Sequence, residues 1–163
     1  MRWHTASPDG GTLAFVALDR IWVMDLPNGS PTRLTSEESN VQEYSPAWSA
    51  DGRSIAFTTW SDDEGGALWT AALSGGDLKK LTEVDGMYLN PTWSPDGTSI
   101  VVARGSGEML RGRMPSDEPW FTLEQVPSRG GEAARIAEVL AARGSHVVTP
   151  EFGSDGRIFF VEA

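Results

Sequence analysis

The chain has 163 residues, of which 39% are hydrophobic and 22% charged, so a packed core is expected rather than a disordered chain. Thirteen basic against 23 acidic residues give a formal net charge of −10, which argues against nucleic acid as a partner. No apolar run approaches the ~20 residues of a membrane span, so membrane insertion is not expected. The absence of cysteine excludes disulfides and thiolate metal sites.

A four-residue turn motif recurs along the chain. Ser-Pro-Asp-Gly at 7–10 returns as Ser-Ala-Asp-Gly at 49–52, as Ser-Pro-Asp-Gly at 94–97 and as Gly-Ser-Asp-Gly at 153–156. The first two intervals are close to the ~40–45 residues of one four-stranded blade of a β-propeller. The third interval is longer because of a Gly- and Pro-rich insertion at 103–119.

Short apolar segments follow each motif in a constant order. The Asp-Gly pair suits a tight hairpin, because glycine accepts a positive φ without steric cost. An aromatic residue stands just before the motif at Trp48, Trp93 and Phe152. The second strand of each unit is expected at 13–15, 55–57, 100–102 and 158–160, the third at 21–24, 68–71 and 120–126, and the outer strand at 33–35, 80–82 and 135–137.

This pattern predicts an all-β fold, a partial β-propeller of about three and a half four-stranded antiparallel blades. The blades are expected at about 2–35, 44–82 and 89–139, with a half blade at 146–162, all in one segment spanning 1–163. Residues 132–143 also fit a helix by spacing, whereas the repeat register favours a strand at 134–139. An open arc leaves a blade face and strand edges uncovered at each end, so a homodimer that covers them is expected.

The repeat resembles a known family. Ser-Pro-Asp-Gly followed by an Ile-Ala-Phe-like strand, an Ile-Trp-Val-Met-Asp strand and Arg-Leu-Thr is similar to the β-propeller repeat of TolB-type proteins over about 5–161. The resemblance implies a propeller fold and makes a periplasmic location an expectation. Residues 17–22, 59–66 and 88–93 look, more narrowly, like the propeller that precedes the catalytic domain of some metal-dependent amidohydrolases. The His-x-His motif of that domain does not occur in this sequence, so no catalytic residue is carried over.

Motifs for catalysis are scarce. No serine stands in a Gly-x-Ser-x-Gly frame, and the only histidines are His4 and His146, near opposite ends of the repeat array. We therefore expect no catalytic residue, no metal and no cofactor. The aspartates of the turn motif recur in every unit, which favours a structural role in the turns. By the same reasoning, inter-blade packing rather than ligand stacking is expected for four tryptophans, Trp22, Trp48, Trp69 and Trp93.

The loops at one end of the blades are rich in acidic residues. They are expected at 36–43, 58–66, 83–90 and 103–119, all on the face opposite the Asp-Gly hairpins. Such charge often serves only to keep a protein soluble. The alternative, more specific hypothesis is that these loops recognise a cationic partner or bind a divalent cation. No Asp-x-Asp-x-Asp-Gly calcium loop is present, which weakens the cation version. The candidate partner-binding residues, here called the acidic loop face, are Glu37, Glu38, Glu43, Asp62, Asp63, Glu64, Asp85, Arg111 and Arg113.

Two functions remain open from the sequence. The first is a non-catalytic binding or scaffold module that presents the acidic loop face to a protein or peptide. The second is a fragment of a larger amidohydrolase-like or peptidase-like hydrolase whose catalytic domain lies outside these residues. Loops as long as the segment 103–119 are usually functional or disordered. In the second case this segment is expected to pack on a neighbouring catalytic domain, and in the first case it is expected to bind a partner.

Overall fold

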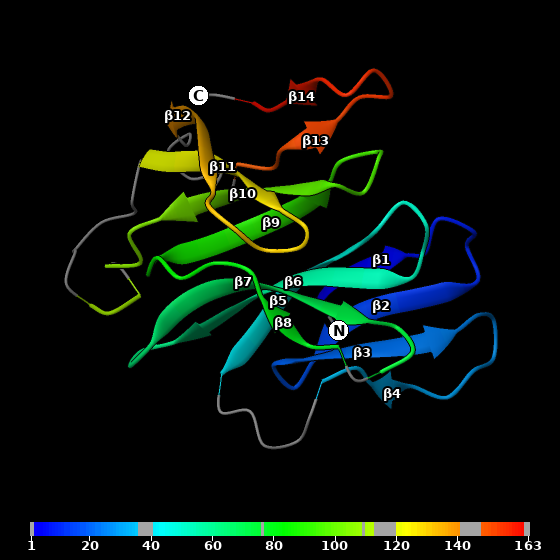
Figure 1. Ribbon diagram of the computed structural model, residues 1–163. Helices are drawn as coiled ribbons and strands as arrows, with labels where there is room; N and C mark the ends of the chain where they lie inside the picture. Colours follow the sequence, from blue (N-terminus) through cyan, green and yellow to red (C-terminus); the bar gives the residue numbers. More distant parts are fainter. Residues whose placement is uncertain are drawn as a thin grey trace.

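Each repeat unit forms one antiparallel sheet in the computed structural model, which describes residues 2–35, 41–75, 77–108, 110–112, 120–140 and 148–161 (Figure 1). The first sheet contains β1 (Arg2–Ala6), β2 (Thr12–Ala17), β3 (Arg20–Asp25) and β4 (Thr32–Arg33). The second contains β5 (Gln42–Trp48), β6 (Ser54–Ser61), β7 (Gly65–Ala72) and β8 (Lys79–Lys80). The third contains β9 (Met87–Trp93), β10 (Ser99–Gly105), β11 (Trp120–Pro127) and β12 (Ala134–Leu140). The fourth has two strands, β13 (Glu151–Phe152) and β14 (Ile158–Phe159).

Strands that are consecutive in the chain are neighbours in every sheet, so each unit is a simple meander. The all-β fold of about three and a half antiparallel blades is therefore confirmed. Residues 134–140 form strand β12 against β11, which confirms the strand and excludes the helix at this position. None of the ranges that the structure describes contains a helix long and apolar enough to cross a membrane.

The core lies between the sheets. Because side chains alternate along a strand, each sheet presents apolar residues to both neighbours. Phe57 of β6 packs towards the first sheet against Val16 and Ile21, while the adjacent Ala56 faces the third sheet and packs with Ile100. These residues are almost fully buried. The blades thus stabilise one another through shared apolar layers.

Three of the four tryptophans lie where the repeat predicts. Trp48 and Trp69 pack at the interface of the first and second sheets, and Trp93 packs between the second and third. Trp22 differs. It pairs with Phe15 across β2 and β3, and strand alternation turns both away from the second sheet. No described blade stands on that side, so inter-blade packing stays a prediction for Trp22.

The β6–β7 hairpin is longer than expected. Residues 58–61 and 65–66, expected in a loop, belong to the strands, and only 62–64 form the turn. The paired glycines at 65–66 do not mark a loop here. A Cβ on Gly66 would lie 2.5 Å from the carbonyl oxygen of Gly86, and the Gly66 amide donates to that oxygen at 3.0 Å. Glycine is needed because two backbones meet at this point.

The turn motif is held by a small hydrogen-bond network. Ser49 Oγ donates to Asp51 Oδ1 at 2.6 Å, and the same carboxylate oxygen accepts the amide of Arg53. Ser49 Oγ in turn accepts the amide of Ser54 at 3.0 Å, where strand β6 begins. The same bonds recur around Ser7 and Ser94. The fourth motif has Gly153 in place of the serine and keeps only the backbone bonds and the Asp155 acceptor. These contacts support the structural role predicted for the motif.

The hydrogen bond from the serine is the first cause that lowers the pKa of Asp9, Asp51 and Asp96. A carboxyl whose folded pKa is lowered stabilises the fold fully above the unfolded value of about 3.9. This stabilisation is lost as the pH falls through the lower folded pKa. The turns therefore contribute to stability at neutral pH and weaken in acid.

Replacing the serine of one motif tests this network. We expect Ser49→Ala to raise the pKa of Asp51 towards its ordinary value, measured from the side-chain carboxyl resonance by NMR. It should also lower the free energy of unfolding in urea by about 1–2 kcal/mol, because the buried hydroxyl bridges two groups. Ser154→Ala, at an exposed position of the fourth motif, is the matched control and should change neither quantity. An unchanged Asp51 titration in Ser49→Ala would contradict the assignment.

Candidate functional site

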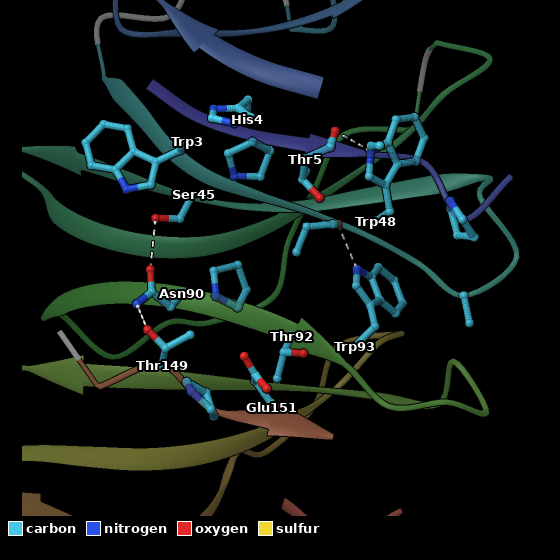
Figure 2. A pocket seen from close by; sticks show the side chains of 17 residues that line it. Trp3, His4, Thr5, Ser45, Trp48, Asn90, Thr92, Trp93, Thr149 and Glu151 are labelled. Atoms are coloured by element: carbon cyan, nitrogen blue, oxygen red, sulfur yellow. Dashed lines mark hydrogen bonds between the residues drawn. The ribbon is translucent and has the colours of Figure 1, made fainter. Parts of the chain in front are cut away.

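The inner strands of the four sheets line an open groove of about 510 Å³. These strands are β1, β5, β9 and β13, and Figure 2 shows the groove from close by. Most of its polar side chains come from equivalent positions of successive units. The groove therefore arises directly from the repeat, because each blade contributes its inner strand to the lining.

A left-handed residue interrupts the inner strand of each complete blade. Trp3, Ser45 and Asn90 have φ values of 43°, 49° and 48°, and they occupy equivalent positions. The strand pairing shifts register at each of these places. Such β-bulges re-aim a side chain, and strained backbone of this kind clusters at functional sites. Here the bulge residues line the groove.

Side chains at the bulge positions connect the blades along the groove. Asn90 Nδ2 donates to Thr149 Oγ1 at 2.9 Å and to the carbonyl oxygen of Val148 at 3.3 Å, while Ser45 Oγ donates to Asn90 Oδ1 at 3.5 Å. Figure 2 shows this row of bonds running from the second blade to the half blade. Asn90 of β9 thus connects β5 with the segment that leads to β13 at one wall of the groove.

Two indoles bridge the same strands from the other side. Trp48 Nε1 donates to the carbonyl oxygen of Thr5 at 3.2 Å, and Trp93 Nε1 donates to that of Ala47 at 3.1 Å (Figure 2). In both cases the acceptor belongs to the inner strand of the preceding blade. The tryptophans before the second and third turn motifs therefore tie neighbouring blades together at the groove.

The acidic loop face is only partly described. Glu37, Glu38 and Arg113 lie outside the described residues. Asp62, Asp63 and Glu64 form the β6–β7 turn, and all three are exposed. This turn stands at the end of the blades opposite the Asp-Gly hairpins, as expected.

Glu43 does not belong to the exposed surface. Its side chain is 1% exposed, and its carboxylate accepts the amide of Ile21 at 2.7 Å and the Thr35 hydroxyl at 2.9 Å. It lies on strand β5 and binds the first blade to the second. The prediction that Glu43 is part of an exposed loop is therefore wrong, because strand alternation turns this carboxylate into the interface.

Asp85 and Arg111 are brought together. Arg111 donates to Asp85 at 2.7 Å and also pairs with Glu108 at 3.4 Å. Its hydrogen bond to Asp85 raises the pKa of Arg111. The guanidinium carbon lies 5.1 Å from the ring centroid of Trp60, a cation–π contact. These contacts fold the segment after β10 onto the second blade.

One of the two histidines lies in the described part of the chain. His4 is exposed in the groove, and His146 lies outside the described residues. In the part of the chain that the structure describes, no three His, Cys, Asp or Glu side chains gather to hold a metal. The groove offers hydroxyls, an amide and aromatic rings, which suit binding through hydrogen bonds and stacking.

Several of these residues were not predicted from the sequence. Trp3, Ser45 and Asn90 were not singled out, and neither were Tyr44 and Trp60. A signal for the groove is nevertheless visible in the printed sequence, since Ser-Pro-Ala-Trp at 45–48, Asn-Pro-Thr-Trp at 90–93 and Thr-Pro-Glu-Phe at 149–152 align in the repeat.

Known proteins resemble the chain over long stretches. The family model of the TolB beta propeller domain matches residues 4–117. The uncharacterized peptidase YuxL of Bacillus subtilis is 30% identical over 132 residues, which cover 74% of this chain and 20% of that protein. The Tol-Pal system protein TolB of Francisella tularensis subsp. mediasiatica is 34% identical over 62 residues, covering 38% of this chain and 14% of that protein.

A solved structure agrees with the fold. TolB from Acinetobacter baumannii superimposes with a TM-score of 0.68 at 20% identity, over 98% of this chain and 37% of that one. The chain therefore spans about a fifth of the peptidase relative and less than two fifths of the solved TolB. At this identity the structural likeness concerns the fold alone.

Replacement of Asn90 tests the role of the bulge. We expect Asn90→Ala to lower the free energy of unfolding by about 2 kcal/mol, because it removes the bonds to 148–149 and places a Cβ-bearing residue without a polar group in the left-handed region. Asn90→Gly loses the same bonds, but glycine adopts a positive φ without the steric cost that alanine has. Asn90→Gly should therefore be more stable than Asn90→Ala by about 1 kcal/mol. Urea denaturation measures both, and equal stability of the two variants would speak against strain at this position.

Proposed function

The chain belongs to the TolB β-propeller family, and we propose that it acts as a non-catalytic binding module whose acidic loop face recognises a protein or peptide. The observation that supports this most is the β6–β7 turn. Its three carboxylates, Asp62, Asp63 and Glu64, are consecutive and exposed. Asp85 packs directly against this hairpin, since a Cβ on Gly65 would lie 1.7 Å from its Oδ1.

A concentrated acidic turn favours a partner with positive charge. Complementary charges raise the rate of encounter and select the partner more than they raise affinity. The Francisella relative is named as a protein of the Tol-Pal system, which supports an interaction role for this chain. A periplasmic location stays a prediction from the family resemblance.

Neutralising the β6–β7 turn tests the proposal. We expect Asp62→Asn/Asp63→Asn/Glu64→Gln to weaken binding to basic members of a peptide array by roughly tenfold at low salt, because exposed charge pairs contribute up to about 1 kcal/mol each. The loss should shrink as salt screens the charges. Binding is measured by fluorescence anisotropy.

The control removes charge from the opposite end of the blades. Asp77→Asn/Glu132→Gln changes exposed carboxylates in the turns that lead to β8 and β12. Binding should survive in this variant. If both variants weaken binding equally, only net charge matters, and the acidic loop face is not the binding surface.

A second candidate function is the propeller segment of a larger peptidase. It is favoured by the 30% identity to the peptidase YuxL, of which this chain spans a fifth. In that case the catalytic groups lie in another part of the protein, and the propeller positions or filters the substrate. The amidohydrolase resemblance of residues 17–22, 59–66 and 88–93 stays a prediction.

The two candidates differ in what covers the open blade faces. Leu13 and Trp22 of the first blade occupy the places that Ile55 and Trp69 fill in the second, where a neighbouring blade covers them. As an independent binding module, the chain is expected to dimerise, and light scattering at micromolar concentration should give twice the mass of 17.6 kDa. A monomer mass, together with further blades and a hydrolase domain in the adjoining coding sequence, would decide for the peptidase segment.

A further inference from the structure

A second cavity of about 360 Å³ opens beside the groove, at the end of the blades that carries the acidic β6–β7 turn. Three blades contribute to it: Trp3 comes from β1, Tyr44 from β5, Trp60 from β6 and Met87 from β9. Leu110, from the segment after β10, closes one side. We call this cavity the aromatic pocket.

The rings of the aromatic pocket are held in fixed positions. Trp3 and Tyr44 meet edge to face, with centroids 5.4 Å apart and planes at 80°. Trp60 is only 5% exposed, and its indole Nε1 donates to Asp62 Oδ1 at 3.0 Å. Trp3 is 43% exposed and stands at the entrance that the pocket shares with the groove. A ligand would therefore meet a largely preformed site.

Charge around the aromatic pocket is negative. Asp62 is the only charged residue among its described lining residues, and the bond from Trp60 fixes its orientation. Burial raises the pKa of Tyr44, and the negative charges of Asp19 and Asp62 act in the same direction. The nearby cation Arg111 is opposed by Asp85 and Glu108, so it leaves no net positive charge near the pocket.

The aromatic pocket does not follow the repeat. Trp60 corresponds to Leu18 in the first blade and to Gly105 in the third, and Tyr44 corresponds to Arg2 and Leu89. Inter-blade packing explains the tryptophans that recur in register, but it does not explain why aromatic residues occupy positions 44 and 60. Arg111 already lies over Trp60, so this ring does accept a guanidinium.

We propose that the aromatic pocket receives the cationic side chain, lysine or arginine, of a bound peptide. The proposal rests on the proposed function, because it names the chemistry by which the acidic loop face selects its partner. The aliphatic stem of such a side chain packs on Met87 and Leu110, and its charged head lies against the rings of Trp3 and Tyr44 and close to Asp62. Neither a neutral nor an acidic side chain satisfies both the rings and the carboxylate.

Short peptides test the pocket directly. The probes are Ac-Gly-X-Gly-NH2 with X as lysine, arginine, norleucine or citrulline, the last two being neutral analogues of the first two. Binding is followed through the assigned indole resonances of Trp3 and Trp60 among the seven tryptophans. We expect the cationic peptides to shift these two resonances and to bind at least about fivefold more tightly than their neutral analogues.

Asp62→Asn provides the decisive variant, with Asp63→Asn as its control. Asparagine still accepts the bond from Trp60, so the fold of the pocket is kept while its charge is removed. Asp63→Asn removes the same net charge from the adjacent exposed position outside the pocket. We expect Asp62→Asn to lower lysine-peptide affinity by at least about fivefold, and Asp63→Asn to change it by less than about twofold.

The outcomes separate this proposal from the proposed function. Equal binding of cationic and neutral peptides overturns the aromatic pocket as a cation site. Equal loss in Asp62→Asn and Asp63→Asn also overturns it, while the acidic loop face as a whole remains the binding surface. If the triple variant of the β6–β7 turn also leaves array binding unchanged, the proposed function fails as well.

Discussion

The structure depends on one constraint, that a four-stranded sheet with apolar residues on both faces must be covered on both sides. Phe57 and Ala56 are adjacent in β6, yet they belong to different interfaces, one with the first blade and one with the third. No blade can bury its own apolar surface alone, so the stability of each blade depends on its stacking against a neighbour. The hydrogen bonds of Trp48 and Trp93 to the preceding inner strand then set how close the blades stand at the groove.

The fold was predictable because its signals repeat. The Asp-Gly turns, the apolar triplets and the outer strands agree in register, and this agreement even decided 134–140 correctly against its helical spacing. Errors arose where the environment of a single residue differs from the pattern. Glu43 reads as a loop charge, but its carboxylate binds the Ile21 amide inside the interface. Gly65 and Gly66 were predicted in a loop, but both lie in β7, where Gly66 meets the backbone of Gly86 and Gly65 meets the side chain of Asp85.

The candidate site was harder to predict for a physical reason. Its residues gather through the curvature of the blade array, which brings Trp3, Tyr44 and Trp60 together from separate parts of the chain. No spacing along the sequence reports that proximity. Of the predicted acidic residues, Asp62 lies in the aromatic pocket and Asp85 lies against Arg111, an arrangement that composition alone did not indicate.

The bulge in the inner strands has a consequence for how any ligand is held. Each inner strand is the free edge of its sheet, and an extended segment can normally add to such an edge through main-chain pairing. Here Pro46 and Pro91 directly follow the bulge residues of the second and third blades and offer no amide hydrogen, and the register break displaces the neighbouring groups, whereas His4 follows the bulge residue of the first blade. The inner edges of the second and third blades are thus poor templates for β-augmentation. A ligand at these edges would have to be held through side chains, whose identity differs from blade to blade.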